Sequence, residues 1–405
     1  MYFQTKEKKE CCGCSACVKA CPTQAIQFDI DEEGFRYPII NKDICIDCKL
    51  CERICPMAHP KYLNTEKPET YLAMLSDEKQ RQRSSSGGLF YAIASWVIRE
   101  NGIVYGCAME KDFTVRHIGV DTMDGLEKLR GSKYVQSELE NVFVEIGESL
   151  KQGRKVYFVG TGCQVAGLKA YLRKDYSNLI TSDLICHGVP SQWLFHQHIN
   201  YLNHKVKGKV LSYQFRDNKH GTGCEIFEYR DIKGNKKIKI KPTYELSPYL
   251  YSFMYSYTYR HSCYNCPFAR IPRQGDFTLA DFWGVKEFFP EIDNSKGCSL
   301  LLLNNEKSHD VWNHIKEQCD WHISKIEDAA KYNGNLLHSS SKPSIRDNIY
   351  QRIREDGYEK ITMTIFRSPR EQKIKFVLFL KNHWWCQIII KTLRPLKNKL
   401  FKKQS

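Results

Sequence analysis

The chain has 405 residues, of which 42% are hydrophobic and 26% charged. This composition is typical of a globular protein of two or three domains, and it excludes a disordered, collagen-like or low-complexity chain. The net charge is +15, and much of it lies between positions 366 and 405, where there are 11 basic residues and one acidic residue. Because no recognition module accompanies this basic tail, we expect no nucleic-acid binding.

Cysteine is the unusual residue, because nine of the 18 cysteines lie between Cys11 and Cys55. The first ten residues, MYFQTKEKKE, contain no apolar stretch. We therefore expect no secretory signal and a cytoplasmic location. In such a chain, dense cysteines indicate metal binding rather than disulfides.

Two cysteine runs near the N-terminus share one spacing. Cys11-x2-Cys14-x2-Cys17-x3-Cys21-Pro22 recurs as Cys45-x2-Cys48-x2-Cys51-x3-Cys55-Pro56. This duplicated spacing is typical of ferredoxins with two [4Fe–4S] clusters, in which the fourth cysteine of each run binds the other cluster. It predicts one cluster on a first cysteine group and another on a second cysteine group. The first group is Cys11, Cys14, Cys17 and Cys55; the second group is Cys21, Cys45, Cys48 and Cys51.

Two zinc sites or a set of disulfides are the alternatives for these runs. Zinc usually takes paired C-x2-C knuckles or mixed Cys and His ligands, so the repeated proline-terminated runs favour iron–sulfur clusters. Cys12 falls outside the spacing, and we interpret it as a bystander.

After a polar linker at 59–68, helices and strands alternate, which predicts a mixed α/β core. The expected strands are 71–75, 102–108, 115–120, 155–159, 179–185, 210–215, 226–229, 277–280 and 300–303. The expected helices are 88–100, 142–151, a segment ending near 174, and 192–202. The predicted organisation is a ferredoxin-like two-cluster domain at 1–60, a core in two parts at 70–152 and 153–340, and a basic helical tail at 345–405.

Two loops of this core could contact a nucleotide or flavin. The segment Ser84–Gly88 precedes a predicted helix, and its serines and glycines suit an anion at the helix N-terminus, although a simple capped loop has the same composition. The segment Arg130–Ser137 combines two cations, hydroxyl groups and a tyrosine, as a solvated turn also can.

Four further cysteines form what we call the core cysteine group: Cys163, Cys186, Cys263 and Cys266. Cys163 and Cys186 follow predicted strands, where α/β sheets place ligands. A third [4Fe–4S] cluster and a structural zinc are equally compatible with these residues, and a catalytic Cys186–His187 pair ranks last. Asp281, in the segment Asp276–Gly284, could bind a ribityl hydroxyl or a backbone amide.

Together these motifs resemble the beta-subunit family of coenzyme F-420 hydrogenases and dehydrogenases, in the form with an N-terminal two-cluster ferredoxin domain. The motifs behind the resemblance are Ser84–Gly88, Arg130–Ser137, Gly160–Gln164, Leu184–Pro190, Cys263–Cys266 and Asp276–Gly284. The resemblance implies FAD and a core [4Fe–4S] cluster on the core cysteine group. It also implies flavin contacts from Ser86, Gly87, Gly88, Ser132, Lys133, Tyr134, Gln136 and Asp281.

The resemblance further implies an oxidoreductase that passes electrons between the clusters, the flavin and a hydride acceptor or donor. The expected partners are a one-electron donor or acceptor protein and a small molecule, either a deazaflavin coenzyme or a substrate of polysaccharide synthesis. A non-catalytic electron-transfer subunit and a structural zinc protein are the alternatives. Gly162 stands where the family usually has proline, and the segment Asn218–Gly223 also departs from the pattern expected near a substrate, which leaves the acceptor open.

The tail segment Lys373–Lys391 contains apolar runs that are interrupted by Lys381, Asn382 and His383. Its continuous apolar runs are therefore too short to span a bilayer. With Trp384 and Trp385 beside lysines, it resembles an interfacial helix on anionic lipid at the inner face of a membrane, but a C-terminal helix docked on the core or on a partner explains the pattern more often.

Overall fold

A mixed sheet of eight strands is the centre of the molecule in the computed structural model, which describes residues 1–219 and 223–382. Its middle strands run parallel, and antiparallel strands continue it on both sides. The strand order is β13 (Cys319–Ser324), β3 (Glu69–Leu75), β12 (Ser299–Leu303), β11 (Phe277–Asp281), β7 (Leu179–Leu184), β6 (Val156–Thr161), β4 (Ile103–Met109) and β5 (Val115–Val120). Both predicted parts of the core therefore contribute to one sheet.

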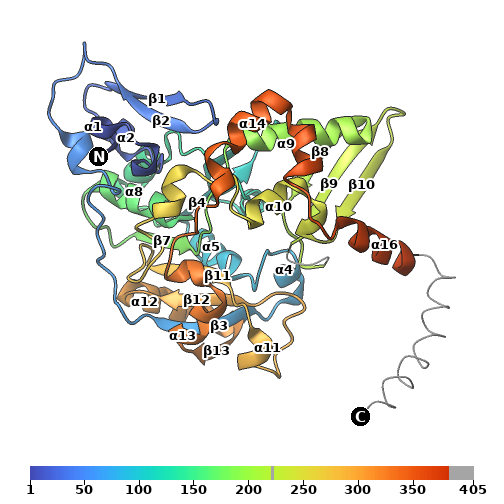
Figure 1. Cartoon of the computed structure of the whole chain (residues 1–405). Helices are drawn as coiled ribbons and strands as arrows, with labels where there is room; N and C mark the ends of the chain where they lie inside the picture. Colours follow the sequence, from blue (N-terminus) through green and yellow to red (C-terminus); the bar gives the residue numbers. More distant parts are fainter. Residues whose placement is uncertain (220–222, 383–405) are drawn as a thin grey trace.

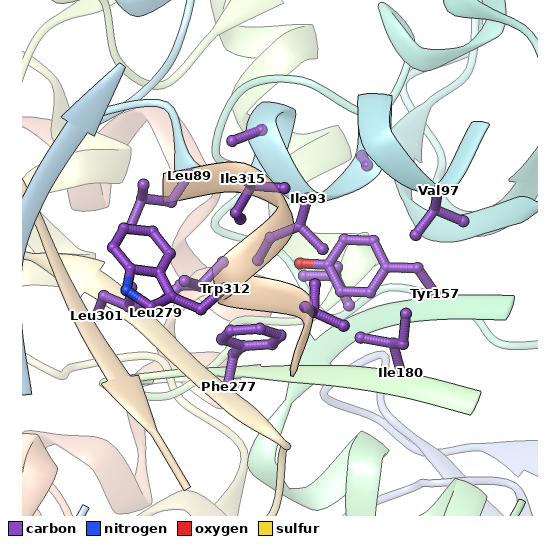
Figure 2. Close-up of a cluster of buried hydrophobic side chains, with 14 of the residues drawn as sticks. Leu89, Ile93, Val97, Tyr157, Ile180, Phe277, Leu279, Leu301, Trp312 and Ile315 are labelled. Carbon is purple, nitrogen blue, oxygen red and sulfur yellow. The ribbon is translucent and has the colours of Figure 1, made fainter. Parts of the chain in front are cut away.

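Helices cover both faces of this sheet, which explains why its parallel strands are apolar throughout. In β6, Tyr157 and Val159 belong to the cluster formed with α5 (Leu89–Arg99) and α12 (Glu306–Ile315). Figure 2 shows the side chains of these two helices meeting Tyr157 and the neighbouring strands. The alternate β6 residues Val156 and Phe158 belong to the cluster with α7 (Val142–Lys151) and α8 (Gly162–Leu172) on the other face.

The N-terminal domain repeats its backbone as it repeats its cysteines. Short helices α2 (Ala16–Ala20) and α3 (Leu50–Arg53) follow equivalent loops, in which Ser15 and Lys49 both have positive φ angles, of 68° and 56°. A hairpin of β1 (Ile26–Ile30) and β2 (Arg36–Ile40) separates the two repeats. This hairpin was not among the predicted strands, and helix α1 (Tyr2–Thr5) precedes the domain.

The N-terminal domain is held directly on the core, as Figure 1 shows for α1, α2 and α8. Cys14 and Ala16 belong to the same hydrophobic cluster as α7 and α8. On the hairpin turn, the carboxylate of Glu33 receives both terminal nitrogens of Arg346, at 2.7 and 2.5 Å, and both residues are buried. The linker also contacts the core, because Asn64 donates to the carbonyls of Arg273 and Gly275 at 2.9 and 2.7 Å.

A second, three-stranded sheet lies beside helix α9 (Gln192–Val206). Its strands are β8 (Gly208–Gln214), β9 (Glu225–Asp231) and β10 (Lys236–Lys241). Glu225 is fully buried there, and His198, Tyr213 and Lys241 satisfy its carboxylate. The remaining α-helices are α4 (Glu78–Gln82), α6 (Met123–Leu126), α10 (Pro248–Met254), α11 (Val285–Phe288), α13 (Ile326–Tyr332), α14 (Ile349–Asp356), α15 (Tyr358–Thr364) and α16 (Glu371–Asn382).

Helix α16 contains the first part of the predicted tail helix. Phe376, Val377 and Phe379 are exposed on it. The rest of the predicted interfacial segment, from His383 to Lys391, lies outside the described residues. Within the described ranges, no helix combines the length and apolarity needed to cross a membrane.

Candidate functional site

The first cysteine group comes together inside the N-terminal domain. Its four cysteines line one partly enclosed cavity, together with Cys12, Gly13 and Met57. Burial, reinforced by the charges of Cys11 and Cys55, raises the pKa of the Cys17 thiol well above its usual value. The structure therefore gathers the four cysteines that the spacing assigned to one cluster.

The second cysteine group lies toward the solvent. Cys45 and Cys48 are exposed, and Ile44 and Ile46 beside them expose 48% and 64% of their surface. Burial raises the pKa of Cys51, with smaller effects from Glu52 and Cys48. The pKa of Cys21 is lowered, because hydrogen bonds from Thr23 and nearby backbone groups outweigh its partial burial. The charge of Cys48 thus acts on the Cys51 thiol, and the charge of Cys51 acts on the Cys17 thiol of the first group.

The core cysteine group is assembled from three elements at one end of the parallel strands. Cys163 lies in the first turn of α8 directly after β6, Cys186 follows β7, and the other two cysteines lie in and just after the 3₁₀ helix η3 (His261–Asn265). Burial and the charges of the other three group members raise the pKa of Cys263 well above its usual value. Burial, with smaller effects of neighbouring cysteines, raises the pKa of Cys186 to about 12 and that of Cys266 to about 11.

Cys12, interpreted as a bystander of the cluster spacing, has a buried thiol in the same packed cluster as Cys14 and Cys163. A hydrogen bond with Cys14 and burial raise the pKa of Cys12 well above its usual value, while a hydrogen bond with Cys163 acts in the opposite direction. Spacing alone gave no signal for this position, because it depends on how the N-terminal domain packs against α8.

The same junction contains a buried arginine that the sequence motifs did not single out. Arg260 donates from Nε to the carbonyl of Cys11 at 2.7 Å and from Nη2 to the Cys11 Sγ at 3.7 Å. Gln136 accepts from Arg260 and donates to the carbonyl of Cys12 at 3.0 Å. Gln136, predicted as a flavin contact, therefore lies at the junction of the first and core cysteine groups.

The two loops predicted to contact a flavin lie side by side. The backbone nitrogen of Ser132 donates to the Ser85 Oγ at 2.8 Å, and the Arg130 Nη2 donates to the Ser84 Oγ at 3.1 Å. Lys133 is directed into the protein, where Nζ donates to the carbonyl of Arg130 at 2.7 Å. Burial lowers the pKa of Lys133 to about 8.

Ser86, Gly87 and Gly88 also have structural contacts within the core. Ser86 donates to the carbonyl of Cys298 at 3.0 Å, and the backbone nitrogen of Gly87 donates to the Ser299 Oγ at 2.9 Å. A Cβ on Gly87 would lie 2.5 Å from the carbonyl oxygen of Ala73, so glycine is needed for this close approach. Gly88 has a φ of +95° at the start of α5.

Tyr134 and Asp281 meet at a polar cluster around Arg216, which the sequence motifs did not reveal. Arg216 donates to both carboxylate oxygens of Asp281, at 2.5 and 3.0 Å, and to the hydroxyl of Tyr134 at 3.4 Å. The Tyr134 ring stacks on Phe253 with centroids 4.5 Å apart. His187 follows Cys186 directly, and burial lowers its pKa while the charge of Asp281 partly offsets that effect. This cluster is therefore near the core cysteine group.

Two family models match the chain in separate segments. Residues 10–58 match a 4Fe-4S dicluster domain, and residues 153–329 match the C terminus of the coenzyme F420 hydrogenase/dehydrogenase beta subunit.

The B chain of anaerobic dimethyl sulfoxide reductase from Haemophilus influenzae is 43% identical over 51 residues, which are 13% of this chain and 23% of that protein. The probable anaerobic dimethyl sulfoxide reductase chain YnfG of Escherichia coli strain K12 is 39% identical over 56 residues, 14% of this chain and 25% of that protein. The chain spans about a quarter of the length of these curated relatives.

A chain in a solved structure of the F420-reducing [NiFe] hydrogenase complex from Methanosarcina barkeri, determined with xenon, also aligns with this protein. The alignment covers 77% of this chain and 98% of the other, with 13% identity and a TM-score of 0.41, which is too low for geometric comparison. Both matched segments lie in the order that the sequence motifs predicted. Residues 153–329 are similar to the C terminus of the coenzyme F420 hydrogenase/dehydrogenase beta subunit, and residues 10–58 are similar to a 4Fe-4S dicluster domain.

Proposed function

We propose that the chain is an iron–sulfur flavoprotein oxidoreductase in which three [4Fe–4S] clusters connect a one-electron protein partner with FAD. Each cysteine group would hold one cluster. The observation that carries the proposal is the packing of the cysteine groups against one another: Cys12 and Cys14 belong to the same packed cluster as Cys163, and Cys14 packs directly on Gly167 of α8. The charge of Cys51 also acts on the Cys17 thiol. Such clusters transfer single electrons, whereas a flavin also exchanges hydride, so a flavin suits the far end of this arrangement.

The four cysteines of the core group suit a [4Fe–4S] cluster, which is held by four cysteine thiolates. Burial and the charges of the other three cysteines raise the pKa of Cys263, so the four thiols lie close enough to act on one another, as ligands of one site would. Iron and zinc analysis of the purified chain distinguishes this cluster from a structural zinc.

The exposed second cysteine group would receive or release electrons at the surface. Ile44 and Ile46 give this loop an apolar rim beside Cys45 and Cys48, which suits brief docking of a one-electron carrier protein. The first cysteine group is more enclosed and would relay electrons to the core group.

The cluster of Tyr134, Arg216 and Asp281 would hold the flavin near Cys186. The Nε of Arg216 is buried and has no hydrogen-bond partner among the described residues, so it can donate to a cofactor oxygen. The loops at Ser86–Gly88 and Ser132–Lys133 would complete the pocket. A deazaflavin coenzyme is the first candidate for the hydride acceptor or donor, and a substrate of polysaccharide synthesis is the second.

Anaerobic purification of the full chain tests this proposal. We expect about twelve iron atoms and twelve sulfides per chain, together with one FAD released by acid. Hydride exchange between the reduced protein and the deazaflavin or a nicotinamide, without a partner protein, would establish catalysis by this chain. Stoichiometric zinc at the core group, or absence of flavin, would contradict the proposal.

A non-catalytic electron-transfer subunit is a second candidate, favoured by one feature of the surface. Cys266 lines an open hollow of about 620 Å³ with Arg270, Leu337 and His338, through which a partner could approach the core group directly. In that case the purified chain would contain the clusters but would show hydride exchange only with its partner.

We place the chain in the cytoplasm, with α16 and the basic tail at an anionic membrane face. Vesicle flotation with and without residues 366–405 tests that location.

A further inference from the structure

Arg260 lies between the first and core cysteine groups and is only 1% exposed. Its backbone nitrogen donates to the carbonyl of Val189 at 2.9 Å, and its own carbonyl accepts from the backbone nitrogen of Cys263 at 2.9 Å. The backbone of Arg260 is therefore part of the core group's loop, whereas its side chain extends to the first group.

The guanidinium of Arg260 makes contacts with neutral protein groups and with one cysteine sulfur. Its nitrogens donate to the carbonyls of Cys11 and Arg36 at 2.7 and 2.9 Å, and to the Gln136 side-chain oxygen at 3.2 Å. The Cys11 Sγ is 3.7 Å from Nη2, and the Tyr37 ring centroid is 4.0 Å from the guanidinium carbon.

Two other arginines in the described ranges, Arg273 and Arg346, are buried to a similar degree, at 2% and 0% exposure. Both of them pair with a carboxylate, from Asp183 and Glu33 respectively. Arg260 forms no such pair among the described residues, although a buried charge without an opposite charge is costly. Metal-bound cysteines are thiolates, so a cluster on the first group would supply the missing negative charge.

The backbone around Cys12 is adapted to this arginine. Gly13 has a φ of +70°, and a Cβ at this position would lie 3.0 Å from the Gln136 Nε2 and 3.2 Å from the Arg260 Nη1. Gln136 completes the contact by donating to the carbonyl of Cys12 at 3.0 Å. The loop that carries Cys11 and Cys14 thus closes directly over the guanidinium.

We propose that Arg260 is a positioning residue that raises the reduction potential of the cluster on the first cysteine group and holds that group against the core group. This inference rests on the proposed function. In each transfer the cluster on the first cysteine group takes up one electron from the donor and then passes it on toward the core group. Arg260 neither gains nor loses a proton in this cycle, and none of its covalent bonds changes. A fixed positive charge hydrogen-bonded to a ligand sulfur stabilises the more negative, reduced form.

Redox titration of the full, anaerobically purified chain, followed by electron paramagnetic resonance, tests this role. In Arg260→Gln we expect the ratio of reduced to oxidised first cluster at a fixed potential to fall about tenfold, a shift of about 59 mV to lower potential. Arg260→Lys keeps the charge and should restore most of the shift. Arg36→Gln is the matched control, because the Arg36 side chain faces Glu138 and only its carbonyl contacts Arg260.

A second variant covers the case in which Arg260→Gln loses the cluster. Gln136→Glu changes little in shape but places a negative charge on the guanidinium, so it should also lower the potential of one cluster. Unchanged potentials in Gln136→Glu, or in Arg260→Gln with full iron content, would overturn the inference. Such a result would leave the proposed function intact, because that function fails only if the unmodified chain lacks the clusters or flavin.

Discussion

The first and second cysteine groups have the same spacing and the same local backbone but different surroundings. Gly13 and Asp47 occupy equivalent positions in the two repeats, with φ angles of +70° and +51°. A side chain at Gly13 would press on Gln136 and Arg260, whose nearest atoms would lie 3.0 and 3.2 Å from its Cβ, whereas the loop around Asp47 is exposed. The comparison shows that docking on the core encloses one repeat, while the other stays exposed to solvent.

Removal of one of the proposed ligands in the core cysteine group should have the largest effect on this arrangement. We expect Cys186→Ser to reduce the iron content from about twelve to about eight atoms per chain, because the two N-terminal clusters keep their ligands. Electrons should then reach the first cluster but no longer reduce the flavin efficiently. Iron analysis and stopped-flow reduction measure the two effects.

The matched control is Cys319→Ser. Cys319 is also buried, but it lies in β13 at the far side of the sheet from the parallel strands. Its iron content should equal that of the unmodified chain, and an equal loss of iron in both variants would contradict the assignment of Cys186.

Loss of the buried ion pair between the hairpin and the C-terminal helices should destabilise the docked domain. Glu33→Gln leaves Arg346 buried without its counter-charge, so we expect the free energy of unfolding to fall by about 3–5 kcal/mol. Anaerobic chemical denaturation measures this change. Glu32→Gln is the control, because the Glu32 side chain is 71% exposed and should contribute little.

The pH dependence of this pair follows from the pKa of Glu33, which hydrogen bonds and charge from Arg346 and His261 lower to about 2 against the opposing effect of burial. The folded-state pKa is below the unfolded value of about 4.3. The stabilisation is therefore fully present above that unfolded value and is lost as the pH falls through 2. Denaturation at pH 7 and pH 3 should show a smaller Glu33→Gln effect at pH 3, and an equal effect would contradict this account.

The smallest effect concerns the exposed repeat. We expect Ile46→Asp to slow reduction by a ferredoxin about fivefold, because the apolar rim is lost at a cost near 1 kcal/mol. Iron content and reduction by dithionite should not change. Ile232→Asp, at an exposed site in the turn between β9 and β10, serves as the control, and equal slowing in both variants would argue against docking at the second group.

Sequence patterns predicted most of the core strands and the helices of the first half of the core. The prediction for Val142–Lys151 coincides with α7, and the alternation of apolar strands and helices gave the mixed sheet. The β1–β2 hairpin and the strands β10 and β13 were missed. Strand β13 exposes Trp321 and Ile323, so its pattern does not resemble that of a buried strand.

The N-terminal clusters could be predicted because their ligands lie within a few residues of one another, and local spacing then dictates the chemistry. The core cysteine group was recognised as four cysteines at strand ends, but the choice between zinc and a cluster depends on their distances in the folded chain. Arg216, which holds Asp281, carries no motif of its own.

The amino-acid sequence by itself determined the duplicated cysteine spacing, the alternating core and the basic tail, because each is a local pattern. Only the tertiary structure decided that Cys12 lies between two cysteine groups and that Gln136 contacts Arg260 rather than the Tyr134 cluster. Cys12, Gln136 and Arg260 are far apart along the chain, so no local spacing in the sequence predicts that they lie close together in the fold. Their contact depends on how the N-terminal domain packs against α8, and thus on burial and shape across the whole molecule.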